Sequence, residues 1–183
     1  MKPSIINLAN AITLLRIILV PFFVYALIYE YRLLALITFC TSALSDGIDG
    51  FIARMKHQKT ELGTILDPLA DKLLLTTSYV TLAILHVAPA WLALIVVSRD
   101  LLILMGAMII HLLTGHLTIS PTIWGKITTF LQLLTILLAL LLYFWGQRSP
   151  WMERAALLTA LFTIISGLHY TYQGLSMLNG SRK

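Results

Sequence analysis

Six apolar runs follow one another along the chain, with only short polar breaks between them. A membrane-spanning helix needs about 20 predominantly apolar residues. The runs cover residues 8–29, 33–54, 64–86, 90–113, 121–146 and 151–173. Turn-forming residues mark the breaks, as in "HVAPAW" after the third run and "WGQRSPW" after the fifth. The pattern predicts an all-α integral membrane protein with six transmembrane helices in one bundle.

Composition supports this prediction and limits the partners. Of 183 residues, 58% are hydrophobic and 11% are charged, which lies far outside the range of soluble domains. The length suits one domain over residues 1–183, and the single cysteine, Cys40, excludes an intrachain disulfide framework. The formal net charge is +5. Because the basic residues are not clustered on a polar domain with interleaved aromatics, we expect no nucleic-acid partner.

Basic residues are divided unequally between the two ends of the expected bundle. Six spans put both termini on one side, and cytoplasmic loops carry an excess of Lys and Arg. That side collects Lys2, Arg54, Lys56, Lys59, Lys126, Arg182 and Lys183, against Arg32, Arg148 and Arg154 on the other. We therefore expect a multi-pass protein whose termini and 54–63 loop are cytoplasmic.

Four aspartates lie near the cytoplasmic ends of the second and third runs, in "SDGIDGFIARMKHQKTELGTILDPLADK". Asp46 and Asp49 are three residues apart, and Asp67 and Asp71 are four apart, so each pair shares a helix face. An Asp at the centre of a spanning helix costs roughly 2.5–3.5 kcal/mol, so four together need a neutralising partner. All-carboxylate sites suit Mg²⁺, Mn²⁺ or Ca²⁺, and Mg²⁺ often binds substrate phosphates as well. The spacing favours a metal–phosphate site, although intramembrane salt bridges or the ion pathway of a cation- or proton-coupled carrier would use similar residues.

The complete motif resembles the signature of the CDP-alcohol phosphatidyltransferase family. It reads Asp46-x2-Asp49-Gly50-x2-Ala53-Arg54-x8-Gly63-x3-Asp67-x3-Asp71, with every position and spacing filled. The resemblance implies an enzyme of a bacterial-type inner (plasma) membrane that transfers a phosphatidyl group from CDP-diacylglycerol to an acceptor hydroxyl and releases CMP. It further implies two divalent ions, Mg²⁺ or Mn²⁺, a cytoplasmic active site and a homodimer.

The family motif also implies roles for individual residues. Asp46, Asp49, Asp67 and Asp71 would hold metal, and Asp71 would also accept the proton of the acceptor hydroxyl. Residues that would contact the CDP donor are Gly50, Ala53, Arg54 and Gly63, together with Asn10, Thr13 and Arg16, whose N-x2-T-x2-R pattern resembles the first helix of bacterial members. Equally, Arg16 could snorkel or pair with an aspartate, with Asn10 and Thr13 joining helices.

Two basic residues outside the motif are candidates for binding an acceptor phosphate. Arg99 lies deep in the fourth run, and Lys126 lies at the start of the fifth. Together they could bind the phosphate of glycerol 3-phosphate, the acceptor that we expect. Phosphatidylglycerol is the alternative acceptor, as in a cardiolipin synthase. A structural role is the other option, with Arg99 paired to Asp100 or Asp71 and Lys126 marking only topology.

Overall fold

The computed structural model describes residues 8–56, 61–114, 122–147 and 149–180, with side chains described for residues 13–45, 70–110, 112, 122–147 and 149–176. Among these residues the regular secondary structure is entirely α-helical. In chain order they are α1 (Leu8–Ile28), α2 (Arg32–Lys56), α3 (Glu61–Ile84), α4 (Ala90–Thr114), α5 (Ile123–Trp145) and α6 (Pro150–Gly180). Each helix coincides with one of the apolar runs, which confirms the all-α prediction.

One helix boundary differs clearly from the sequence-based expectation. The sixth apolar run ends at residue 173, whereas α6 continues to Gly180. Hydropathy falls after Gly167, but the segment that follows keeps residues that form helices well, such as Leu175 and Met177. An apolar run therefore marks the part of the helix suited to lipid, and the helix itself can extend beyond it.

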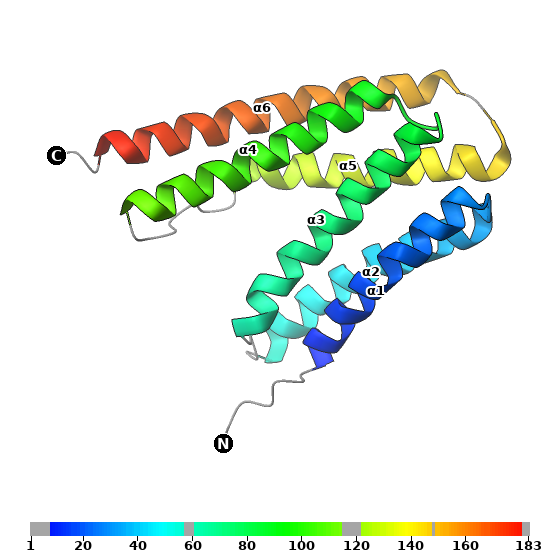
Figure 1. Cartoon of the computed structure of the whole chain (residues 1–183), viewed down its shortest axis with the longest axis horizontal. Helices are drawn as coiled ribbons and strands as arrows, with labels where there is room; N and C mark the ends of the chain where they lie inside the picture. Colours follow the sequence, from blue (N-terminus) through cyan, green and yellow to red (C-terminus); the bar gives the residue numbers. More distant parts are fainter. Residues whose placement is uncertain (1–7, 57–60, 115–121, 148, 181–183) are drawn as a thin grey trace.

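The helices form two arms that meet at one end (Figure 1). In one arm α1 packs against α2 and α3, and in the other α6 packs against both α4 and α5. Contacts of α5 with α2 and of α3 with α4 and α5 join the arms. The α1–α2, α3–α4 and α5–α6 turns lie at the closed end, and the start of α1 and the end of α6 lie at the open end (Figure 1). The end of α2 and the start of α3, which carry the aspartate motif, also lie at the open end.

Tight turns bring consecutive helices back at the closed end. Glu30 and His86 adopt positive φ angles of 59° and 55°, directly after α1 and α3. Gly146, with φ 66°, caps α5 and donates its backbone N–H to the carbonyls of Leu142 and Tyr143. Left-handed residues end helices in this way because they satisfy carbonyls that lack a partner within the helix. The turns fix α1–α2, α3–α4 and α5–α6 as antiparallel neighbours.

Three helices contain segments long and apolar enough to cross a membrane. They are Ala90–Ile110, Ile123–Trp145 and Pro150–Ser176, found by length and composition among the described residues. Helices α1 and α2 contain shorter apolar segments, Thr13–Ile28 and Arg32–Ser45. The predicted helical membrane protein is thus supported through α4, α5 and α6.

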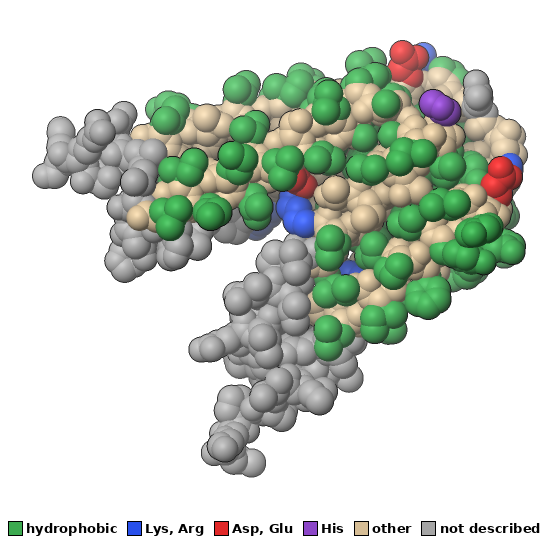
Figure 2. Space-filling model, in the orientation of Figure 1, with side chains coloured by type: hydrophobic (Ala, Val, Ile, Leu, Met, Phe, Trp, Pro, Cys, Tyr) green, Lys and Arg blue, Asp and Glu red, His purple; other side chains and the backbone are tan. Residues whose placement is uncertain are grey.

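The outer surface and the interior differ as expected for helices in lipid. Large apolar side chains such as Leu94, Leu104 and Leu168 are more than two-thirds exposed, and Figure 2 shows apolar side chains distributed along the visible described surface of both arms. Between α5 and α6, the hydroxyls of Thr135 and Thr159 lie 2.6 Å apart and are buried. Interhelical hydrogen bonds of this kind join helices whose outer faces are apolar.

Candidate active site

A buried arginine of α1 holds the last aspartate of the motif. Arg16 Nη1 donates to Asp71 Oδ1 of α3 over 2.6 Å. The Arg16 side chain is 1% exposed and that of Asp71 is 40% exposed. A charged group buried in a helical bundle needs an opposite charge, and the third helix supplies it here. Asp71 therefore has a fixed orientation and an accessible face.

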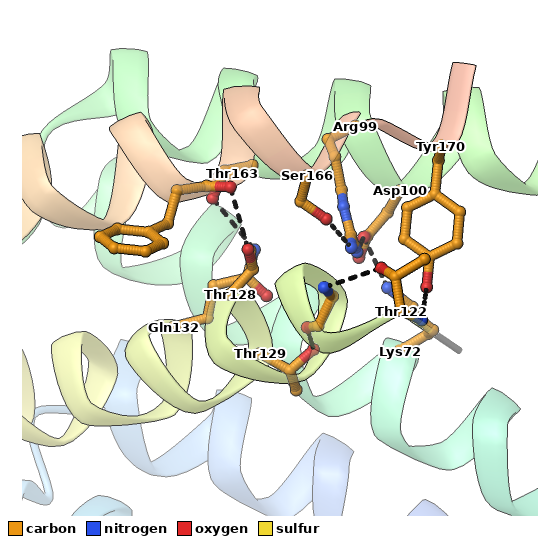
Figure 3. A network of polar contacts seen from close by, with 12 residues as sticks. Lys72, Arg99, Asp100, Thr122, Thr128, Thr129, Gln132, Thr163, Ser166 and Tyr170 are labelled. Carbon is orange, nitrogen blue, oxygen red and sulfur yellow. Dashed lines mark hydrogen bonds and ion pairs between the residues drawn. The ribbon is translucent and has the colours of Figure 1, made fainter. Parts of the chain in front are cut away.

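A second ionic cluster lies one residue further along α3. Asp100 Oδ1 forms an ion pair with Lys72 Nζ at 2.5 Å and accepts a hydrogen bond from Arg99 Nη1 at 2.8 Å (Figure 3). Asp100 and Arg99 are 9% and 7% exposed, whereas Lys72 is 45% exposed. The carboxylate thus joins a buried cation of α4 to an accessible cation of α3. Among the described residues its second oxygen, Oδ2, is buried without a hydrogen-bond partner.

Helix α6 fixes the arginine of this cluster. Arg99 Nη2 donates to Ser166 Oγ over 2.7 Å, and its guanidinium carbon lies 5.6 Å from the centre of the Tyr170 ring. Figure 3 shows Arg99 between Ser166 and Asp100, with Tyr170 beside them. Both terminal nitrogens are therefore engaged inside the bundle, and an aromatic face adds an attractive contact.

Tyr170 also contacts the start of α5. The backbone N–H of Thr122 donates to the Tyr170 hydroxyl over 3.1 Å, and Thr122 Oγ1 accepts from the N–H of Gly125 as the helix N-cap. Gly125 is buried, and a β-carbon there would lie 2.8 Å from the Tyr170 hydroxyl oxygen. Lys126 follows directly and is exposed.

The two ionic clusters are neighbours because Asp71 and Lys72 are consecutive. Their five charged groups are three cations, Arg16, Lys72 and Arg99, and two carboxylates, Asp71 and Asp100, which leaves one net positive charge. Figure 2 shows basic and acidic side chains in the hollow between the two arms. An accessible carboxylate beside a net positive cluster could take a proton from a hydroxyl of an anionic molecule.

Comparison with known proteins assigns this arrangement to a family. Residues 6–166 match the family model described as CDP-alcohol phosphatidyltransferase. The chain belongs to the CDP-alcohol phosphatidyltransferase family. The match covers most of the chain, including all five charged residues of the two ionic clusters. The family predicted from the aspartate motif is confirmed.

Relatives within the family differ in the reaction that their names give. A probable phosphatidylglycerophosphate synthase of Mycobacterium tuberculosis is 33% identical over 192 residues, covering 100% of this chain and 88% of the relative. The CDP-diacylglycerol–glycerol-3-phosphate 3-phosphatidyltransferase of Bacillus subtilis is 31% identical over 181 residues, covering 90% and 93%. A probable cardiolipin synthase (CMP-forming) of Drosophila melanogaster is 30% identical over 186 residues, covering 92% of this chain but 58% of the relative.

Most of the family motif can be placed only as backbone. Asp46, Asp49, Gly50, Ala53 and Arg54 lie in the last three turns of α2, Gly63 and Asp67 lie in the first two turns of α3, and Asn10 lies in the first turn of α1. Their side chains lie outside the described residues. No group of three or more His, Cys, Asp or Glu gathers among the described side chains, of which Asp71 alone belongs to the expected metal ligands. The metal site therefore stays a prediction.

Among the predicted residues whose side chains are described, some are buried and paired within the bundle, whereas Lys126 is exposed. Thr13 and Arg16 are buried one turn apart on α1. Arg16 pairs with Asp71, which agrees with the alternative in which this arginine pairs with an aspartate. Arg99 is paired internally with Asp100. Lys126 makes no side-chain ion pair or hydrogen bond within the described part of the chain, and no contact there joins it to Arg99.

The structure adds three residues, Lys72, Ser166 and Tyr170, to the Arg99–Asp100 pair that the sequence analysis gave as a structural alternative. They complete the second ionic cluster and its contacts with α6. For Lys72 and Asp100 a signal existed, because charged residues inside apolar helices mark functional sites. Ser166 and Tyr170 carried no such signal, because a serine and a tyrosine in an apolar run are ordinary helix-packing residues.

Proposed function

We propose that this chain transfers the phosphatidyl group of CDP-diacylglycerol to glycerol 3-phosphate, releasing CMP and forming phosphatidylglycerophosphate. The observation that carries the proposal is the Asp71 carboxylate, oriented by Arg16 and followed directly by a net positive cluster. A hydroxyl acceptor that bears a phosphate needs both features. The relatives named for this reaction also match nearly their whole length, at 88% and 93%.

The residues of the chain have distinct parts in the proposed reaction. Arg16 keeps one oxygen of Asp71 in place, so that the carboxylate can accept the proton of the acceptor hydroxyl. The acceptor oxygen then bonds to the phosphorus of the phosphatidyl group, and the bond from that phosphorus to the CMP oxygen breaks. The acyl chains of the donor remain in lipid beside the apolar outer faces of the helices.

The expected metal ions fit the residues that would hold them. Asp46, Asp49, Asp67 and Asp71 form an all-oxygen set suited to Mg²⁺ or Mn²⁺. Asp71 is accessible despite its ion pair, and only four residues, 57–60, separate the helices that carry the two pairs. When bound, two such ions would neutralise the diphosphate and stabilise the attacking and leaving oxygens.

The membrane arrangement is part of the proposal. In the proposed arrangement all six helices span the bilayer: α4, α5 and α6 contain segments long and apolar enough to do so, and α1 and α2 contribute shorter apolar segments. The chain forms one domain of a multi-pass protein in a bacterial-type inner (plasma) membrane and pairs as a homodimer. The excess of Lys and Arg residues on the side of the 54–63 loop supports a cytoplasmic position for the termini and the active site.

Purified protein can be tested with four acceptors in parallel. CDP-diacylglycerol is supplied with Mg²⁺ or Mn²⁺ and with glycerol 3-phosphate, phosphatidylglycerol, inositol phosphate or serine, and both CMP and the lipid product are identified. We expect turnover with glycerol 3-phosphate. Turnover with phosphatidylglycerol alone would make the chain a cardiolipin synthase. The absence of CMP release with every acceptor would contradict the enzymatic proposal as a whole.

A further inference from the structure

We propose that Lys72 binds the phosphate of the acceptor and that Asp100, held by Arg99, positions the Lys72 side chain. This inference rests on the proposed function, because it assigns the acceptor subsite of that reaction. It replaces a direct role of Arg99 with an indirect one. Neither Lys72 nor Asp100 belongs to the aspartate motif.

Accessibility distinguishes the two cations that share Asp100. The Arg99 side chain is 7% exposed, and its terminal nitrogens donate to Asp100 and Ser166. Although its Nε has no hydrogen-bond partner among the described residues, this burial leaves a phosphate little access to the guanidinium. Lys72 is 45% exposed. Its ammonium has three N–H groups, and within the described residues its one ionic contact is with Asp100, so further N–H groups can point to a ligand.

Charge explains why a buried arginine is present beside an accessible lysine. Lys72 and Asp100 alone would be a neutral pair with little attraction for an anion. Arg99 shares the same carboxylate oxygen, at 2.8 Å, and the three groups together carry one net positive charge. The cluster therefore attracts a phosphate through Lys72, while the Arg99 charge is stabilised by Asp100, by Ser166 and by the Tyr170 ring.

Position along α3 connects this phosphate site to the reacting hydroxyl. Consecutive Cα atoms are about 3.8 Å apart, so the side chains of Asp71 and Lys72 begin close together. Successive helix residues point about 100° apart, but both side chains are partly exposed, at 40% and 45%. Glycerol 3-phosphate is a small molecule with a phosphate at one end and a primary hydroxyl at the other. With its phosphate on Lys72, its hydroxyl can reach the Asp71 carboxylate.

The decisive comparison uses Lys72→Met, Lys72→Arg and the double variant Lys72→Met with Asp100→Asn. Lys72→Met should raise the KM for glycerol 3-phosphate about 10- to 100-fold, as expected for the loss of a charge-assisted hydrogen bond. The KM for CDP-diacylglycerol should change by less than about twofold, and Lys72→Arg should restore part of the acceptor affinity. The matched control is Arg154→Met, which removes a cation at the closed end of the bundle. It should change neither the KM for glycerol 3-phosphate nor the KM for CDP-diacylglycerol.

The double variant separates binding from structural support. If Lys72 only neutralises Asp100, removing both charges should return the KM for glycerol 3-phosphate to the wild-type value, and the inference is wrong. If Lys72 binds the phosphate, the KM should stay raised. Thermal unfolding and gel filtration in detergent would show whether Lys72→Met folds. If it does not, the KM of the double variant is the test.

The same assays distinguish failure of this inference from failure of the proposed function. A wild-type enzyme that does not use glycerol 3-phosphate contradicts both, and phosphatidylglycerol is the acceptor to compare. A wild-type enzyme that uses glycerol 3-phosphate, with an unchanged KM in Lys72→Met, contradicts the inference alone. A proportional rise of both KM values would likewise contradict it, because the subsite would then not be specific to the acceptor.

Discussion

Arg16 and Asp71 lie 55 positions apart in the chain and are joined by a hydrogen-bonded ion pair of 2.6 Å between α1 and α3. The pair is asymmetric, because the arginine is 1% exposed and the aspartate is 40% exposed. A buried cation thus orients an accessible carboxylate. This is a suitable arrangement for a residue that must accept a proton from a substrate.

Removing the arginine should affect turnover more than donor binding. In Arg16→Gln the Asp71 carboxylate loses its fixed orientation, so we expect kcat to fall by about 10- to 100-fold, within the range of misplaced acid–base groups. Arg16→Lys keeps the charge and should recover part of the activity. Steady-state kinetics with both substrates check this. A variant with unchanged kcat but a much higher KM for CDP-diacylglycerol would instead favour the donor-binding role expected for Arg16 from the sequence.

Two glycines provide a matched pair for the packing around Tyr170. A β-carbon at Gly125 would lie 2.8 Å from the Tyr170 hydroxyl oxygen, whereas one at Gly106 meets nothing within 4 Å. Gly125→Ala should therefore destabilise the protein by about 1–3 kcal/mol, and Gly106→Ala should be neutral or slightly stabilising. Thermal unfolding in detergent measures the difference. Tyr170→Phe should reduce the effect of Gly125→Ala, since it removes the hydroxyl, and an unchanged effect would contradict the close approach of Tyr170 to Gly125.

The helices were predictable from the sequence, and the reason is local. Each apolar run is long, is bounded by polar or turn residues and became one helix. The family motif could also be identified from the sequence, because it depends on fixed spacings within two neighbouring helices. Even the Arg99–Asp100 pair was among the alternatives, since the two residues are adjacent.

Contacts between distant helices were not predictable in the same way. Ser166 lies 67 positions after Arg99, and nothing in an apolar run indicates which neighbouring helix each face will meet. The helices of a bundle can be arranged in several ways with the same apolar pattern. For that reason the acceptor site was expected at Arg99 with Lys126, whereas the observed ionic contacts join Arg99, Asp100 and Lys72.

The expected metal ligands should respond to metal concentration differently from the base. Asp46→Asn, Asp49→Asn and Asp67→Asn should weaken divalent-ion affinity, and raised Mg²⁺ or Mn²⁺ should restore part of their activity. Asp71→Asn should lower kcat by about 10²–10⁴-fold with little rescue. Turnover at a series of metal concentrations checks this, with CDP-diacylglycerol binding measured separately. Recovery of Asp71→Asn by metal to the same degree as the others would show that Asp71 is mainly a ligand.

The most direct test of the central proposal is the stoichiometry of transfer. Glycerol 3-phosphate labelled in its phosphate is supplied with CDP-diacylglycerol and the purified protein, and labelled lipid and released CMP are counted together. We predict one labelled phosphate in lipid for each CMP, with the product identified as phosphatidylglycerophosphate and with the signal lost in Asp71→Asn. CMP release without labelled lipid would contradict the proposal that glycerol 3-phosphate is the acceptor.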